Sequence, residues 1–286
     1  MSDVDTTSRI GLLFTEAFGQ RALVAATLVG LCAPFAGAFL VQRRLSLVGD
    51  GIGHLALAGV AVGALVGVSG TWGALIVAVL GAFLLELLRV RGRLTGDLSL
   101  ALLFYLGIAA GVVGLSLAGR FNTSALGILF GSLFAVTWGD VLLIAVLGAV
   151  VVFAVILLYK PLLAVALDEE TARAAGLPVD ALNLLLVCLT ALLVVGGMRV
   201  VGLLLVAALM IVPVAAGSKV AHSFRATLGW AVAVGAGSAW LGLLVAAGQG
   251  ELVPGGTIVL TAIAAFLVFA AIGRRTAVAH RPRKSA

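Results

Sequence analysis

Long apolar runs, broken only by short charged segments, occupy most of this sequence. Hydrophobic residues make up 63% of the 286 residues and charged residues only 10%, whereas soluble proteins carry about 25% charged residues. So few charges cannot cover a surface that faces water, which excludes a soluble enzyme and a nucleic-acid-binding protein. A helix crosses a bilayer with roughly 20 apolar residues, so the chain has room for roughly eight or nine crossings. The sequence predicts an all-α polytopic membrane protein.

The apolar runs predict the individual membrane spans. They lie at 21–41, 51–69, 72–90, 98–118, 139–159, 181–198, 200–217, 226–247 and 254–273. Two features leave the number open between eight and nine. Residues 181–217 can form one broken hairpin, and the short apolar piece 124–136 can lie in the membrane interface or re-enter the membrane.

The positive charges predict the orientation, because Lys and Arg are enriched in cytoplasmic loops. With nine spans and an outer N-terminus, every Lys and Arg falls on the inner side except Arg9, Arg21, Arg120 and Arg199. We therefore expect the cytoplasmic segments to be 42–48, 91–97, 160–180, 218–225 and 274–286. The basic tail at 274–286 is typical of a segment that contacts anionic lipids.

Asp50 and His54 are polar residues at a depth where the bilayer makes them costly. An Asp at the centre of a membrane helix costs about 2.5–3.5 kcal/mol, so it marks a functional site by default. The spacing of i and i+4 puts both side chains on one helix face, roughly 9 and 15 Å beyond Arg44 at 1.5 Å per residue. Carboxylate and imidazole together suit Zn²⁺, Mn²⁺ or Fe²⁺. We interpret the pair as half of a metal site.

Other interpretations of this pair stay open from the residues alone. Asp50 can cap a helix that starts near Gly51 while His54 bonds to a neighbouring helix, or the two can relay protons without a metal. Two ligands are also too few for a complete metal site, so a metal requires further ligands from the backbone or from another subunit. Gly49 and Gly53 beside the pair would let the backbone unwind or another helix come close.

The segment 160–180 is the longest polar stretch between spans. Asp168 is suited to cap a short helix, Glu169 and Glu170 fall in its first turn, and Gly176 follows its end. The segment predicts a capped helix on the inner face, either a plain connector or a docking element for another protein. The sequence contains no GxxxxGK[ST] motif, so ATP bound through a P-loop must be hydrolysed by a second polypeptide.

Four blocks, in the same order, make the chain resemble the permease subunits of metal-ion ABC importers of the ABC-3 type, the zinc, manganese and iron uptake family. They are FLVQRRLSLVGDGIGHLALAGVAVG at 39–63, FGSLFAV at 130–136, LDEETARAAGLPVDALN at 167–183 and MRVVGLLLVAALMIVPVAAG at 198–217. The resemblance implies the type II architecture of the vitamin-B12 importers, with residues 1–286 forming one transmembrane permease domain in the plasma membrane of a prokaryote.

The resemblance also implies partners and residue roles. It implies a second permease copy, an ATP-binding cassette ATPase on the cytoplasmic side and an extracytoplasmic metal-binding protein. The Asp-x-x-x-His pair of the family matches Asp50 and His54, which would coordinate the ion in the pathway. Its ATPase-coupling helix matches the segment containing Asp168, Glu169, Glu170, Arg173 and Gly176.

We therefore expect no permanently bound cofactor and, as transported ion, Zn²⁺ or Mn²⁺, with Fe²⁺ as a further candidate. Transport would proceed by alternating access driven by the partner ATPase. The alternative is a proton-coupled secondary transporter or channel that acts without an ATPase.

Overall fold

In the computed structural model, every regular element among the described residues is a helix, which confirms the predicted fold class. The structure describes residues 6–90, 96–119, 127, 131, 135–249 and 252–279. The helices are α1 (Thr6–Thr15), α2 (Ala17–Gln42), α3 (Val48–Val66), α4 (Gly70–Val90), α5 (Gly96–Leu117), α7 (Trp138–Leu157), α8 (Tyr159–Leu167), α9 (Glu169–Ala174), α10 (Val179–Met198), α11 (Leu203–Gly217), α12 (Phe224–Gln249) and α13 (Pro254–Ala279).

Eight of the helices in the described part of the chain are long and apolar enough to cross a membrane. They are α2, α3, α4, α5, α7, α10, α12 and α13. The ninth predicted span, 200–217, forms only the shorter apolar helix α11. α10 and α11 are separate helices, because Gly202 has a φ of 89° at the start of α11. The piece 124–136 lies almost entirely outside the described residues.

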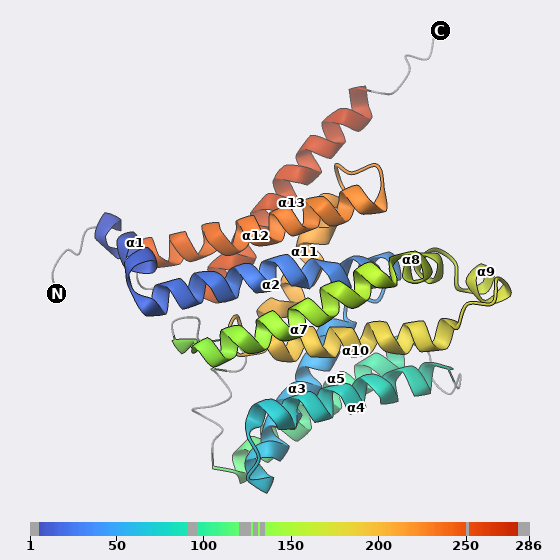
Figure 1. Ribbon diagram of the computed structural model, residues 1–286, viewed down its shortest axis with the longest axis horizontal. Helices are drawn as coiled ribbons and strands as arrows, with labels where there is room; N and C mark the ends of the chain where they lie inside the picture. The colour runs from blue at the N-terminus through green and yellow to red at the C-terminus, as the bar shows by residue number, and fades with distance from the viewer. Residues whose placement is uncertain are drawn as a thin grey trace.

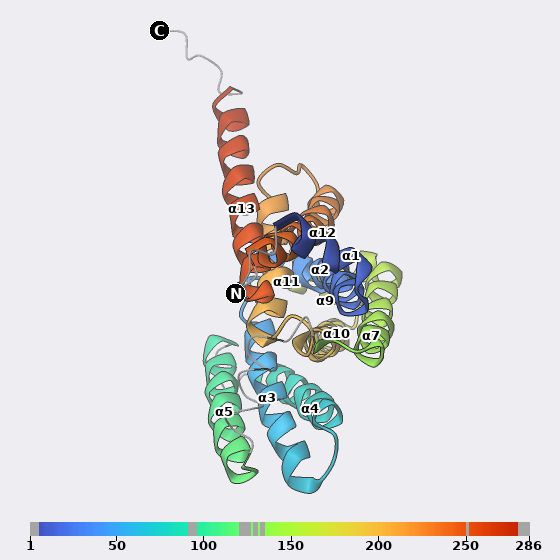
Figure 2. The same cartoon turned by 90° about the vertical axis from the view of Figure 1, so that its left-hand side faces the viewer.

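The helices are arranged around α2, α10 and α11. α3, α4 and α5 pack together as a group at the lower side of both views, while α12 and α13 lie on the opposite side of the centre (Figures 1 and 2). Glycines allow the close packing of α3 and α4, since a Cβ at Gly59 would lie 2.7 Å from the Cα of Ala74. This is the small-residue packing expected of helices in lipid, where apolar side chains gain little from pairing with each other.

One end of the bundle carries the segments that the positive charges assign to the cytoplasm. α8 and α9 lie at this end, where α2 and α4 finish and α10 begins (Figure 1). The sequence predicted a single short helix here, whereas the structure also contains α8, which buries Leu162 and Val165. The ring of Tyr159 at the start of α8 packs against Phe39 and Phe224, with centroid distances of 6.2 and 6.0 Å. This aromatic contact fixes α8 against α2 and α12.

Candidate metal pathway and coupling segment

Asp50 and His54 lie on one continuous helix, as the sequence predicted. α3 begins at Val48, after an N-cap Leu47 that provides no side-chain hydrogen bond. Asp50 is therefore inside the first turn and does not cap the helix, so that interpretation was wrong. Within the described part of the chain, no group donates a hydrogen bond to Asp50 or forms an ion pair with it.

The imidazole of His54 is buried and incompletely bonded. The residue is 8% exposed, and its Nδ1 atom has no hydrogen-bond partner among the described residues. Phe104 of α5 packs edge-on against the ring, with the centroids 4.4 Å apart and the planes inclined by 72°. A buried polar atom without a partner is costly. The donor set, a carboxylate and an imidazole nitrogen, fits a divalent transition metal.

The glycines around the pair bring other helices close and do not unwind α3. A Cβ at Gly51 would lie 2.7 Å from Leu100 Cδ1 of α5, and one at Gly53 would meet Leu203 of α11. A Cβ at Gly107 of α5 would lie 2.5 Å from the backbone carbonyl carbon of His54. α5 and α11 therefore pack closely against the part of α3 that carries the pair. Among the described residues no cluster of three or more His, Cys, Asp or Glu is placed to hold a metal.

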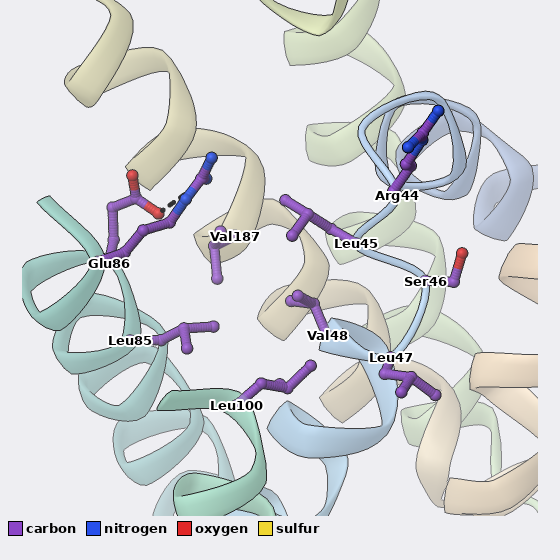
Figure 3. A pocket seen from close by; sticks show the side chains of 10 residues that line it. Arg44, Leu45, Ser46, Leu47, Val48, Leu85, Glu86, Leu100 and Val187 are labelled. Carbon is purple, nitrogen blue, oxygen red and sulfur yellow. Dashed lines mark ion pairs between the residues drawn. The ribbon is translucent and has the colours of Figure 1, made fainter. Parts of the chain in front are cut away.

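A cavity of about 100 Å³ lies next to the first turn of α3. Figure 3 shows Leu85, Val48 and Leu100 around it, with Glu86 at its edge. Arg89 also lines the cavity. Glu86 Oε2 is 3.7 Å from Arg89 Nη1, an i, i+3 ion pair on one helix. The cavity is thus largely aliphatic but borders on charged groups at the C-terminal end of α4.

The capped helix that the sequence predicts within 160–180 is α9. Asp168 is the N-cap of α9 and accepts hydrogen bonds from the backbone N–H groups of Glu170 and Thr171. The hydroxyl of Thr171 also donates to Asp168, and these bonds lower the pKa of its carboxyl. Gly176 has a φ of 82° after the helix end, the left-handed conformation that favours glycine.

The charged side chains of α9 face different surroundings. Glu170 is exposed, and Arg173 pairs with Asp180 at the start of α10, with 2.6 Å between Arg173 Nη2 and Asp180 Oδ1. Glu169 instead points toward the membrane helices and bonds to Arg43 and Arg89. This contact could not be predicted from the sequence, because the two arginines are 126 and 80 positions away from Glu169 along the chain.

At the opposite end of the bundle, Arg199 contacts residues of two other helices. Its Nη1 donates to Thr71 Oγ1 at 2.8 Å, and its Nε lies 3.3 Å from Asp140 Oδ1. Thr137 is the N-cap of α7, and Asp140 completes a capping box with it. Arg199 therefore links the turn between α10 and α11 to the starts of α4 and α7.

Comparison with known proteins agrees with these features. The model of the ABC 3 transport family matches residues 15–273. The manganese import system permease protein ScaB of Streptococcus gordonii is 31% identical over 251 residues, covering 88% of this chain and 90% of the relative. The manganese transport system membrane protein MntC of Halalkalibacterium halodurans is 33% identical over 201 residues, covering 70% of this chain and 69% of the relative.

Solved structures show the same architecture. A chain of PsaBC from Streptococcus pneumoniae, solved in complex with Fab, has a TM-score of 0.82 and 30% identity, with coverage of 92% of this chain and 94% of that one. An inward-facing putative metal-chelate type ABC transporter has a TM-score of 0.66 at 20% identity, with 90% and 89% coverage, which shows the shared fold. The chain therefore belongs to the ABC 3 transport family and is a multi-pass plasma-membrane permease of the metal-ion ABC importer type that its sequence motifs predict.

Proposed function

We propose that this permease forms the pathway of an ATP-driven importer of a divalent transition metal, with Mn²⁺ as the first candidate. The observation that carries the proposal is the pair Asp50 and His54 on α3: a carboxylate and an imidazole nitrogen, both without partners in the described chain, on a helix of membrane-spanning length. Both relatives described above are named as manganese transporters, which favours Mn²⁺ over Zn²⁺ and Fe²⁺.

A second copy of the permease supplies the ligands that one chain lacks. Two protomers that face each other across the pathway contribute two Asp50 carboxylates and two His54 imidazoles. These four side chains provide enough oxygen and nitrogen donors for a transition metal. The ion is cargo, so the site has to hold it with moderate strength and release it when the pathway opens inward.

Energy and delivery come from other subunits. The chain has no P-loop motif, so an ATP-binding cassette ATPase docks at the α8–α9 end and hydrolyses ATP there. A metal-binding protein delivers the ion at the opposite end of the bundle, near Arg199 and the start of α4. ATP binding and hydrolysis move α9 and switch the pathway between outward-open and inward-open states, as alternating access requires.

The test is the metal content of cells under metal limitation, measured by mass spectrometry in a strain that lacks this chain. We expect the wild-type chain to restore manganese, while Asp50→Ala and His54→Ala do not, at equal amounts of protein in the membrane. Restoration of zinc or iron instead of manganese would show that the restored metal, and not manganese, is the transported ion. Equal restoration by the wild type and both variants would contradict the site.

The same strain separates the ATP-driven importer from a proton-coupled transporter. An inactivating substitution in the P-loop of the partner ATPase should abolish metal uptake completely. Uptake that persists in that background and follows the proton gradient would show a secondary transporter and contradict the proposal.

A further inference from the structure

A group of charged and polar side chains joins four helices at the α8–α9 end. Arg43 and Arg89 both donate to the same oxygen, Oε1 of Glu169, and the Arg89 bond is 2.9 Å long. Asn183 of α10 accepts from Arg43 Nη1 at 2.6 Å and donates to Glu169 Oε1 at 3.4 Å. We call Glu169, Arg43, Arg89 and Asn183 the Glu169 cluster. When Glu86, which pairs with Arg89, is counted with the cluster, two carboxylates balance the two guanidinium groups.

The cluster is shielded from water on its membrane side. The Arg43 side chain is 5% exposed and Asn183 is buried, while Glu169 itself is 36% exposed. Charge-assisted hydrogen bonds at such partly buried sites are stronger than those at an open surface. Burial raises the pKa of Glu169, but Arg89 and Arg43 lower it by more, so the pKa lies below its usual value and Glu169 stays ionised.

α9 has few other attachments to the membrane helices. It is six residues long, and among those residues Ala172 alone is buried. Its other ion pair, between Arg173 and Asp180 at the start of α10, is exposed. Apolar packing therefore contributes little to holding α9, and the Glu169 cluster is its main non-covalent connection to α2 and α4.

Arg43 and Arg89 each connect the Glu169 cluster to α3, the helix that carries Asp50 and His54. Arg43 caps the end of α2 and is separated from α3 only by a short loop. This loop contains Arg44 with a φ of 58°, a conformation that is uncommon for a residue other than glycine. Arg89 lies in the last turn of α4, which packs along α3. A displacement of Glu169 thus acts on α3 from two sides.

The cavity beside the first turn of α3 gives that turn room to move. It is bounded by the loop after Arg43, by Glu86 and Arg89, and by Leu100 of α5 (Figure 3). Closely packed interiors resist small displacements. A void of about 100 Å³ at this place lowers the resistance in the direction of α4 and α5.

We propose that Glu169 is a positioning residue that couples α9 to the metal pathway by holding Arg43 and Arg89 together. When the ATPase moves α9, the Glu169 cluster carries the movement into the end of α2 and the last turn of α4, and so into the first turn of α3. This inference rests on the proposed function. Within it, Glu169 acts on the membrane helices, while the exposed Glu170 beside it faces the ATPase side.

The experiment uses the complete transporter with its ATPase and metal-binding protein in proteoliposomes. Mn²⁺ uptake and ATP hydrolysis are measured on the same vesicles, and the result is the number of ions taken up per ATP hydrolysed. Glu169→Gln keeps the shape of the side chain and removes its charge. We expect it to lower this ratio about tenfold, within the range of about 5- to 150-fold that is typical of couplings between sites.

Three further variants test whether a lower ratio comes from the loss of the Glu169 cluster. Glu16→Gln removes an exposed carboxylate at the start of α2, far along that helix from Arg43, and should leave the ratio at the wild-type value. Arg89→Gln should also lower the ratio, but by less, because the bond between Arg43 and Glu169 remains. The double variant should be no worse than Glu169→Gln alone, because that variant has already lost the connection to Arg89. Arg89→Lys keeps the charge but loses the planar guanidinium, so it should give an intermediate ratio.

The outcomes separate this inference from the proposed function. If wild-type vesicles take up no Mn²⁺, Zn²⁺ or Fe²⁺, the proposed function fails. If the wild type transports and Glu169→Gln has an unchanged ratio, or if its only defect is loss of the bound ATPase, the coupling role of Glu169 fails. If Glu169→Gln does not reach the membrane, Arg89→Lys decides, and a wild-type ratio for that variant overturns the proposal.

Discussion

The contact between α5 and the backbone of His54 predicts that a single methyl group will disturb the metal pathway. A Cβ at Gly107 would lie 2.5 Å from the carbonyl carbon of His54 and 2.6 Å from the backbone nitrogen of Leu55, whereas ordinary Cβ contacts begin at 3.4 Å. Backbone atoms cannot rotate away as a flexible side chain can. Gly107→Ala therefore forces α5 and α3 apart by about 1 Å, at the cost of about 1–3 kcal/mol that overpacking causes.

A shift of that size at His54 should affect transport more than stability. Misplacing a functional group by about 1 Å can lower a rate about 100-fold, so we expect Gly107→Ala to reduce metal uptake by at least about tenfold. The assay is initial uptake in proteoliposomes, together with the melting temperature of the purified protein. Gly237→Ala on α12 is the matched control, because a Cβ there meets nothing within 4 Å. Wild-type uptake and stability for Gly107→Ala would refute the close contact at His54.

Three more predictions concern α9 and the turn that follows it. Because the pKa of Glu169 is lower in the folded protein than its usual 4.5, its ionised form stabilises the fold above that pH, and the stabilisation is lost as the pH falls through the lower value. The melting temperature of Glu169→Gln should therefore lie below that of the wild type by a constant amount at neutral pH and approach it only in acid. Asp168→Ala should weaken binding of the ATPase in a pull-down, because α9 loses its N-cap. Asp168→Asn should retain the binding, since Asn caps a helix as well as Asp does. Equal binding by both variants would contradict the role of the cap. Gly176→Ala should destabilise the turn after α9 by about 1 kcal/mol, because Gly176 has a positive φ. The measurement is hydrogen exchange, which should become faster in this turn. Unchanged exchange would be evidence against a strained turn.

Local features of this protein could be predicted from sequence, because they depend on neighbouring residues. The i, i+4 relation of Asp50 and His54 follows from one uninterrupted helix. The cap of α9 by Asp168 follows from the chemistry of the residue and the turn that it precedes. The long apolar helices follow from hydropathy alone.

Features that depend on packing between distant segments could not be predicted. The contact of Glu169 with Arg43 and Arg89 joins parts of the chain that only the tertiary fold brings together. α8 was missed because its apolar stretch is too short for a span and is stabilised by packing of Tyr159 against Phe39 and Phe224.

The most direct test of the account is Mn²⁺ uptake by the reconstituted transporter with Asp50→Asn or His54→Gln in the permease. Each substitution nearly preserves the size of the side chain but weakens it as a metal ligand. The account predicts that both variants assemble with the ATPase and hydrolyse ATP, yet take up almost no Mn²⁺, Zn²⁺ or Fe²⁺. Uptake at the wild-type rate by both variants would contradict the assignment of Asp50 and His54 to the ion pathway.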